Sequence, residues 1–306
     1  MLEEFKPEAA LKLIEDEKPT IVAGVPAQLI AMVTHPDFDQ YDVSSLRCFV
    51  WAGSPLPYDM ALKAEERLNT KIVGCFGALD IGIFAMSDIS DPPEVRHLTA
   101  GKLFPGMDFK LIDDKGKDVP RGEVGTFYCR GPSSFGCAWK DMEYTIEVWG
   151  SLSKDAWATT GDFGKIDGHG NLSIVGRKKD MILRGGMNIY PPEIENLLLT
   201  NPKVKSVAVV PMPDQVLGEK VCAYIIPMDG KVFVFDEMIS FLKEKKIAPF
   251  KFPERLEVVK GFPMSGDGLK IRKEDLARDI ADKLKREEEY PESGPKHIRP
   301  AFFFSP

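Results

Sequence analysis

The alternation of helix-like and strand-like segments over the first hundred residues constrains the fold more than any other feature of the chain. Short apolar or β-branched runs lie at residues 20–25, 48–52 and 71–76, and apolar residues recur at helical spacing between them. Such alternation is typical of a parallel sheet that helices cover. The pattern therefore predicts an α/β layer over residues 1–105.

The pattern changes twice further along the chain. Residues 106–178 contain short alternating strands separated by turn residues, which predicts a β-rich subdomain, either a small β-barrel or an antiparallel sheet. From residue 179, helix and strand patterns combine into a smaller α+β unit, which a helix over residues 274–289 closes through one apolar stripe. Residues 286–306 are rich in proline and predict a tail without a core of its own.

Charge and hydropathy exclude several classes of function. The chain has 40 Lys and Arg residues against 47 Asp and Glu residues, and the net charge of −7 gives no electrostatic field that would attract nucleic acid. No stretch approaches the roughly 18 uninterrupted apolar residues of a membrane span. We therefore expect small-molecule chemistry, with neither nucleic acid nor a membrane span involved.

Cysteine and histidine usage indicates the compartment and limits the chemistry. The five cysteines are scattered without a close pair, which predicts reduced and mostly buried thiols. The N-terminus lacks the basic start and apolar region of a secretory signal, so we expect a cytoplasmic protein. The four histidines are far apart, and their spacing indicates no metal site or triad unless distant residues converge.

The candidate chemistry lies in a series of polar stretches that contain glycine. Taken singly, each has an ordinary structural explanation, because a glycine turn after a parallel strand is common and an Asp in a loop can act as a cap. Their order and spacing carry more information. The stretches are AGSPLP (52–57), CFGALD (75–80), TTGD (159–162), GRKKDMILRGGMNIYPPEIE (176–195) and GDGLKIRK (266–273).

In this order the stretches resemble the adenylate-forming superfamily, which includes acyl-CoA synthetases, aryl-CoA ligases, luciferases and the adenylation domains of peptide synthetases. The GGMNIYPPEIE run looks most like the acyl- and aryl-CoA ligases. The resemblance implies a partial adenylate-forming ligase fold, in which an α/β layer and a β-barrel-like subdomain precede a smaller α+β C-terminal domain. Residues 1–178 would be the second part of the large AMP-binding domain, and residues 179–285 a small mobile domain.

The reaction implied by this resemblance joins a carboxylic acid to ATP as an acyl-adenylate and then transfers the acyl group to coenzyme A. The implied cofactors are ATP or AMP, Mg²⁺ and coenzyme A. Four residues near the glycine turns, Trp51, Phe76, Ile81 and Phe84, favour an apolar acid such as a fatty acid over acetate. The alternative is that these residues belong to the core, as aromatic residues beside a buried strand more often do.

The resemblance also assigns nucleotide and cofactor contacts. Asp162, in TTGD, would accept hydrogen bonds from both ribose hydroxyls. Arg177 would offer its fork of donors to ribose or phosphate oxygens, and its alternative interpretation is a surface salt bridge. The other residues assigned to nucleotide or cofactor binding are Gly53, Ser54, Pro55, Phe76, Gly77, Ile174, Lys179, Gly185 and Gly186.

Catalysis is assigned to Lys270, a mobile cation that would bridge the substrate carboxylate and the α-phosphate. The GDG spelling before it leaves Lys273 as an alternative, although the following IRKEDL favours Lys270. Lys179 falls where the family has a hinge between its two domains. Gly185 and Gly186 would let the backbone approach the pantetheine arm of coenzyme A, or else form a hairpin turn.

Two departures from the family pattern affect phosphate and metal binding. Leu79 replaces a threonine that bonds the nucleotide phosphate, whereas Asp80 keeps an oxygen ligand for Mg²⁺. The Ser/Thr/Gly-rich phosphate loop of the family is absent from these residues and would precede residue 1. We therefore expect a ligase portion that is weak or inactive alone.

A sheet that lacks its usual neighbouring subdomain would leave an apolar face, which either a homodimer or a second chain would cover. The hypothesis from a different class is a non-catalytic AMP- or CoA-binding or assembly module that keeps the scaffold. A third hypothesis makes the run Phe302–Phe304 in the tail a docking peptide.

Overall fold

The computed structural model describes residues 5–54, 56–78, 81–134, 137–151, 156–266 and 270–289. The chain divides into two compact units, unit 1 (Met1–Lys178) and unit 2 (Lys179–Pro306). Each unit has its own sheets and its own apolar core. Of the expected tail, residues 286–289 instead end a helix, whereas the part from residue 290 onward, with its Phe302–Phe304 run, lies outside the described residues.

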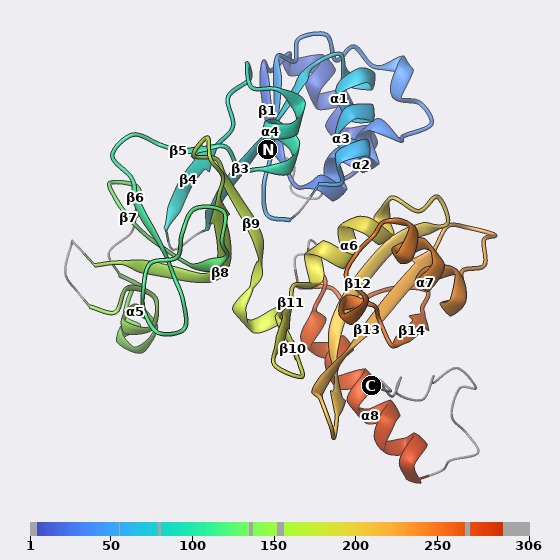
Figure 1. The fold of residues 1–306 in the computed structure, drawn as a ribbon. Helices are drawn as coiled ribbons and strands as arrows, with labels where there is room; N and C mark the ends of the chain where they lie inside the picture. Colours follow the sequence, from blue (N-terminus) through green and yellow to red (C-terminus); the bar gives the residue numbers. More distant parts are fainter. Residues whose placement is uncertain are drawn as a thin grey trace. The chain divides into compact units, whose positions relative to one another are not determined.

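The first sheet of unit 1 has five strands in chain order (Figure 1). The first three strands pair in parallel, which confirms the α/β layer expected from the alternation of segments. The last two pair antiparallel and were not predicted. The strands are β1 (Ile21–Gly24), β2 (Cys48–Trp51), β3 (Lys71–Ala78), β4 (Gly82–Met86) and β5 (Lys102–Leu103).

One apolar core joins the parallel strands to helices of unit 1, burying side chains such as Leu11, Leu29 and Phe49. Local sequence sets the helix ends: Pro7 opens the first helix, where the missing N–H costs nothing, and Asn69 ends the third in a left-handed conformation. The helices before the second sheet are α1 (Pro7–Glu17), α2 (Pro26–Val33), α3 (Tyr58–Leu68) and α4 (Pro93–Leu98), with a 3₁₀ turn η1 (Phe38–Gln40).

The second sheet of unit 1 is antiparallel and open. Of the two expected alternatives, a small β-barrel or an antiparallel sheet, the structure has the antiparallel sheet and does not close it into a barrel, because alternation specifies strand faces but not closure. Asp141 caps the helix in this region by accepting a hydrogen bond from the Tyr144 amide at 3.0 Å. The elements are β6 (Asp108–Ile112), β7 (Gly125–Arg130), α5 (Met142–Trp149), β8 (Ala158–Ile166) and β9 (Leu172–Arg177).

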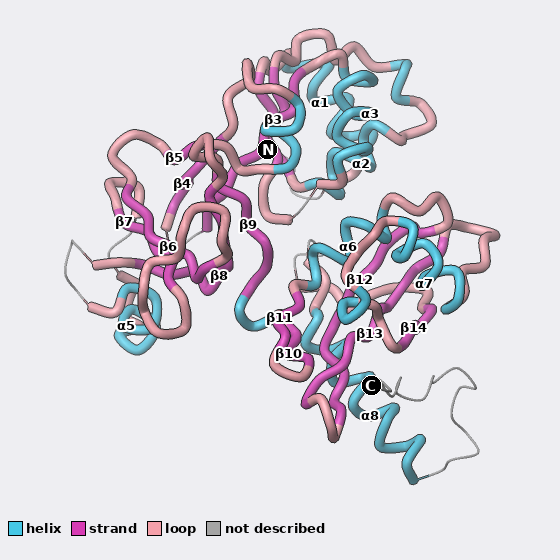
Figure 2. The backbone as a smooth tube through the Cα atoms, viewed as in Figure 1, coloured by secondary structure: helices cyan, strands magenta, loops and turns pink. Residues whose placement is uncertain are grey.

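Unit 2 combines helices with one sheet in an α+β arrangement (Figure 2). An apolar core lies on each face of this sheet. Alternate residues of the long strand β12 point to opposite faces of the sheet. Val207 and Val209 pack in the core that includes α6 and α7, whereas Ala208 and Val210 pack in the core that includes α8. The elements are η2 (Lys178–Asp180), β10 (Ile182–Arg184), β11 (Met187–Ile189), α6 (Pro191–Leu199), β12 (Val204–Asp214), β13 (Gly218–Pro227), α7 (Phe235–Glu244), η3 (Pro249–Lys251), β14 (Arg255–Val258) and α8 (Lys273–Glu289).

The cysteines are free thiols. Cys48, Cys75, Cys129 and Cys222 are buried and Cys137 is exposed, which confirms the expectation of mostly buried, reduced cysteines. Within the described ranges, no helix has the length and apolar character needed to cross a membrane.

Candidate active site

The first group of predicted site residues lies at one edge of the first sheet. The register pairs Gly24 with Trp51 and Trp51 with Gly74, so the parallel strands β1, β2 and β3 point their carboxyl ends toward the same edge. Gly53 and Ser54 follow β2 there, and Gly53 has a φ of 88°, which L side chains rarely adopt. Ligands of open α/β sheets usually bind outside this edge.

Phe76 and Gly77 lie on the part of β3 that extends beyond β2 and pairs with β4. A Cβ atom at Gly77 would lie 2.6 Å from the carbonyl oxygen of Gly82, so glycine permits the close approach of the two strands. Phe76 packs edge-on against Phe127, with 5.3 Å between ring centroids. Gly77 thus has a structural reason to be glycine, independent of any ligand.

The residues expected to favour an apolar acid divide into two kinds. Ile81 and Phe84 are fully buried in the core of unit 1, which agrees with the alternative interpretation. Trp51 is half-buried, and its indole N–H has no hydrogen-bond acceptor among the described residues. A buried donor without an acceptor is rare in native structures. Trp51 also packs against the core of the parallel sheet, and any contact of it with an acid stays a prediction.

Asp162 and Arg177 are brought together by the β8–β9 pairing. The two residues are direct register partners, and Arg177 Nε lies 3.3 Å from Asp162 Oδ1. The Asp162 side chain is 6% exposed and accepts a hydrogen bond from the Thr160 hydroxyl, whereas the Arg177 side chain is 46% exposed. The pair therefore joins an anchored, buried acceptor to a donor fork that reaches solvent.

The negative charge of Asp162 acts on the buried thiol of Cys129. Burial, reinforced by the negative charge of Asp162, raises the pKa of the Cys129 thiol to about 12. Ile174, three residues before Arg177 on β9, pairs with Gly164 and packs against the same core. Its place supports the β8–β9 hairpin, and any contact of Ile174 with a nucleotide stays a prediction.

Lys179 lies in the 3₁₀ turn that opens unit 2. Its ammonium is 3.1 Å from Glu274 Oε1, at the start of α8. The hydrogen bond from Lys179 lowers the pKa of Glu274. This contact spans 95 residues of sequence, and no motif predicted it.

Gly185 and Gly186 form the two-residue turn of the β10–β11 hairpin. Their φ angles are 55° and 84°, and Arg184 pairs with Met187 across the turn. Positive φ at both central positions is the signature of a type I′ turn, for which glycine is favoured. The hairpin-turn interpretation is therefore sufficient to explain both glycines, and their role toward coenzyme A stays a prediction.

Lys270 and Lys273 differ in what their side chains contact. The Lys270 backbone forms two hydrogen bonds with Ser265. Its N–H donates to Ser265 Oγ at 2.9 Å, and its carbonyl oxygen accepts from the Ser265 N–H at 2.7 Å. Its side chain is exposed, and no carboxylate in the described ranges pairs with it. Lys273 instead lies 2.6 Å from Glu195 in a mostly buried ion pair. Of the two candidates, Lys270 has the available ammonium.

The structure tests no metal site. The proposed Mg²⁺ ligand Asp80 lies outside the described residues, as do Pro55 and Leu79. Among residues whose placement is described, no group of three or more His, Cys, Asp or Glu side chains could hold a metal ion. Mg²⁺ binding at Asp80 therefore stays a prediction.

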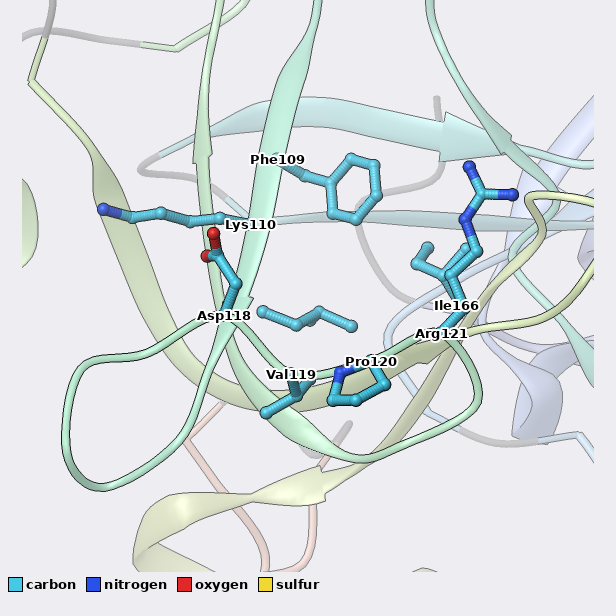
Figure 3. Close-up of a pocket in the computed structure, with 8 residues that line it drawn as sticks. Phe109, Lys110, Asp118, Val119, Pro120, Arg121 and Ile166 are labelled. Carbon is cyan, nitrogen blue, oxygen red and sulfur yellow. The ribbon is translucent and has the colours of Figure 1, made fainter.

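A shallow pocket of about 210 Å³ opens on unit 1 away from the predicted site residues. Figure 3 shows Phe109, Val119, Pro120 and Ile166 around it, with the Lys110 side chain extending away. The Lys110 ammonium lies instead over the Trp157 ring, 4.6 Å from its centroid. None of the predicted site residues lines this pocket.

Sequence reasoning missed a buried charged cluster in unit 1. The Arg96 guanidinium donates to both oxygens of Glu65, at 2.7 and 2.8 Å, and His97 Nε2 lies 3.2 Å from the same carboxylate. Glu65 Oε1 also accepts from the Ile72 amide at the start of β3. The cluster thus holds α3 and α4 to the strand that carries Phe76 and Gly77. Residues separated by about thirty positions gave no spacing signal.

Comparison with known proteins identifies the family. The AMP-binding enzyme family matches residues 1–139, and the AMP-binding enzyme C-terminal domain matches residues 193–269. The chain belongs to the adenylate-forming superfamily. The resemblance drawn from motif order is confirmed, and the fold is that of an adenylate-forming ligase in partial form.

The relatives of this superfamily member include acyl-CoA and aryl-CoA ligases. It is 32% identical to the medium-chain fatty-acid–CoA ligase of Escherichia coli (strain K12) over 285 residues, which make up 93% of this chain and 50% of that protein. It is 34% identical to the indoleacetate–CoA ligase of Aromatoleum aromaticum over 279 residues, 91% of this chain and 53% of that protein.

A solved structure agrees with these sequence relatives. The amide bond synthetase McbA from Marinactinospora thermotolerans superposes with a TM-score of 0.82 at 30% identity, covering 91% of this chain and 56% of that one. The chain therefore spans about half the length of the curated relatives that it matches.

Proposed function

We propose that this chain is a portion of an acyl-CoA synthetase-like ligase. In the first step a carboxylate oxygen attacks the α-phosphorus of ATP and pyrophosphate leaves, giving an acyl-adenylate. In the second step the sulfur of coenzyme A loses its proton and attacks the acyl carbon, and AMP leaves. The observation that carries the proposal is the pairing of buried Asp162 with half-exposed Arg177 in the motif context of the family.

The ribose site in this proposal is built from both residues. Asp162 is held on β8 and by the Thr160 hydroxyl, so it can accept from ribose hydroxyls without first becoming ordered. The 3.3 Å separation of Arg177 Nε from Asp162 lies beyond the usual hydrogen-bond range. The guanidinium can therefore turn toward a ribose or phosphate oxygen at little cost in pairing energy.

Lys270 supplies the mobile positive charge of the first step. As the carboxylate attacks, negative charge gathers on the oxygens of the α-phosphate, and a cation placed there stabilises the transition state. Because no described carboxylate holds its ammonium, Lys270 can reach these oxygens without breaking an ion pair. In the second step, unit 2 would turn about Lys179 so that the Gly185–Gly186 hairpin faces coenzyme A.

The experiment is ATP–pyrophosphate exchange with medium-chain, aromatic and short carboxylic acids. We expect Lys270→Ala to lower exchange by about 10²- to 10³-fold, the usual effect of losing one transition-state contact. The matched control is Lys260→Ala, an exposed lysine of unit 2 without an ion pair in the described ranges, which should leave exchange unchanged.

The same assay shows whether this chain is active alone or only together with a second polypeptide. Exchange that appears only when a second polypeptide supplies the phosphate-loop half of a relative supports a different second chain as partner, whereas exchange by this chain alone that rises with its concentration supports a homodimer. No exchange under either condition, with any acid, contradicts the ligase proposal.

Leu79 favours a second candidate function, because an apolar side chain where the family has a phosphate-binding threonine weakens catalysis more than nucleotide binding. In this version the chain is a non-catalytic AMP- or CoA-binding module. Calorimetry with AMP tests this function. Asp162→Asn should lower the affinity for AMP by about tenfold or more, the effect of losing a hydrogen bond to a charged group. The control is Asp108→Asn, which breaks the exposed cross-strand ion pair with Arg130 and should leave the affinity for AMP unchanged.

A further inference from the structure

The junction between the two units is anchored on both sides within three residues. Arg177, the last residue of β9, is fixed in unit 1 by its register with Asp162. Lys179, the first residue of unit 2, is held by Glu274, 3.1 Å from its ammonium. Only Lys178 lies between these anchors.

Glu274 sits on a rigid element of its own unit. It lies in the first turn of α8, whose Leu276 and Ile280 are buried against the sheet. The Tyr224 hydroxyl donates to Asp279 Oδ2 at 2.6 Å and pins the same helix. A partner placed on such a helix fixes the position of a side chain better than one on a loop does.

We infer that Glu274 is a positioning residue that acts through Lys179. By tethering Lys179 to α8, it restrains the backbone rotation at Lys178 and Lys179 through which one unit turns against the other. The loop carrying Lys270 enters the same helix, so the tether also links the junction to the catalytic lysine. This inference rests on the proposed function, in which the two half-reactions require two arrangements of the units.

The contribution of this tether is small but measurable. Both side chains are exposed, 61% for Lys179 and 72% for Glu274, and exposed pairs of this kind change equilibria by about 1.5- to 5-fold. A shift of that size is enough to alter how the units divide their time between two arrangements, without changing whether either unit folds.

The test measures the distance between the units by electron–electron double resonance. Cys137 is the exposed native thiol of unit 1, and Val232→Cys adds an exposed site, 73% accessible, in unit 2. In the protein labelled at these two sites, Glu274→Gln should change the ratio of the two populations in the inter-unit distance distribution by about 1.5- to 5-fold. The matched control is Asp282→Asn, which removes an exposed charge of the same helix that has no ion-pair partner in the described ranges.

Further variants separate tethering from a general structural effect. Lys179→Gln should reproduce the change seen in Glu274→Gln, and the double variant should add nothing, because both remove the same contact. In 0.5 M salt the wild-type distribution should approach that of the variants. A Glu274→Gln distribution that matches wild type, or an equal change in Asp282→Asn, overturns the inference.

A kinetic measurement links the tether to chemistry. The ratio of thioester formation to adenylate formation should change in Glu274→Gln by the same 1.5- to 5-fold factor, while melting of unit 2 stays unchanged. Unequal resonance distributions with an unchanged ratio would overturn the link to the half-reactions. Absence of adenylate in wild type, both alone and with the phosphate-loop half of a relative, would instead refute the proposed function, and the distance distributions would still decide the tether.

Discussion

Replacing Arg96 by methionine should destabilise unit 1 more than any surface change of the same charge. The Arg96 side chain is 2% exposed, donates to both oxygens of Glu65 at 2.7 and 2.8 Å, and donates to the carbonyl oxygen of Ile72 at 3.2 Å. A further bond reaches the carbonyl oxygen of Asp91. Arg96→Met removes all of these donors and leaves the carboxylate of Glu65 without its cation.

The magnitude follows from that burial. The Glu65 side chain is 13% exposed, so the carboxylate left behind would be largely dry, and removing one partner of a buried ion pair costs about 3–5 kcal/mol. Domains of 150–250 residues lose about 2–4 °C of melting temperature for each kcal/mol, which predicts a fall of about 6–20 °C for unit 1. Replacing Glu65 by methionine as well should recover part of this loss, because no unpaired charge then remains.

The assay is urea unfolding read by hydrogen exchange of peptides from residues 58–78, so that unit 1 is followed by itself. The control is Arg67→Met on α3, the helix that carries Glu65; the Arg67 side chain is 39% exposed and its Nη2 lies 3.5 Å from Asp39. That change should cost less than about 1 kcal/mol. Equal losses for Arg96→Met and Arg67→Met would refute the assignment of the cluster to stability.

Three further predictions concern the described parts of both units. Burial lowers the pKa of His97 below its ordinary value of 6.5, so the unfolded chain binds the proton first, and unit 1 should lose stability as the pH falls below about 6.5. Urea titrations from pH 7.5 to 5.5 should show a slope of no more than about 1.4 kcal/mol per pH unit, which His97→Gln flattens. At the β10–β11 turn, Gly186→Ala should cost unit 2 about 1 kcal/mol in urea unfolding, and Gly186→Asn clearly less, because Asn tolerates the left-handed conformation. Tyr224→Phe should lower the thermal stability of unit 2 by about 1.5–3 kcal/mol through loss of its bond to ionised Asp279, and an unchanged melt would contradict that role.

Elements with a clear periodicity were predictable, and elements whose buried residues are polar were not. The stripe Leu276, Ile280 and Leu284 predicted α8 because these apolar residues recur at helical spacing and pack on the sheet. The helix α4 gave no such pattern, since its buried members are Arg96 and His97. Their burial depends on Glu65 from another helix, and a local pattern carries no information about that distant partner.

The candidate site also contains residues that the sequence predicted and a contact that it did not. Motif order predicted Asp162 and Arg177 individually, and the antiparallel β8–β9 hairpin explains why they meet, because direct register partners lie within reach of each other. The contact between Lys179 and Glu274 joins the first turn of unit 2 to its last helix. Only the tertiary fold of unit 2 brings those two side chains together, so sequence spacing could not have revealed it.

The choice between Lys270 and Lys273 shows what local structure adds to a motif. Lys273 begins α8, and its partner Glu195 also accepts a hydrogen bond from the Val209 amide, so that ammonium is fixed to the sheet. Using Lys273 in catalysis would leave Glu195 largely buried without its cation, at a cost of several kcal/mol. Lys270 lies just before the helix with its backbone closed onto Ser265 and its side chain in solvent, so no pair has to break before it meets a substrate. A cation that must move between arrangements is therefore better placed at Lys270.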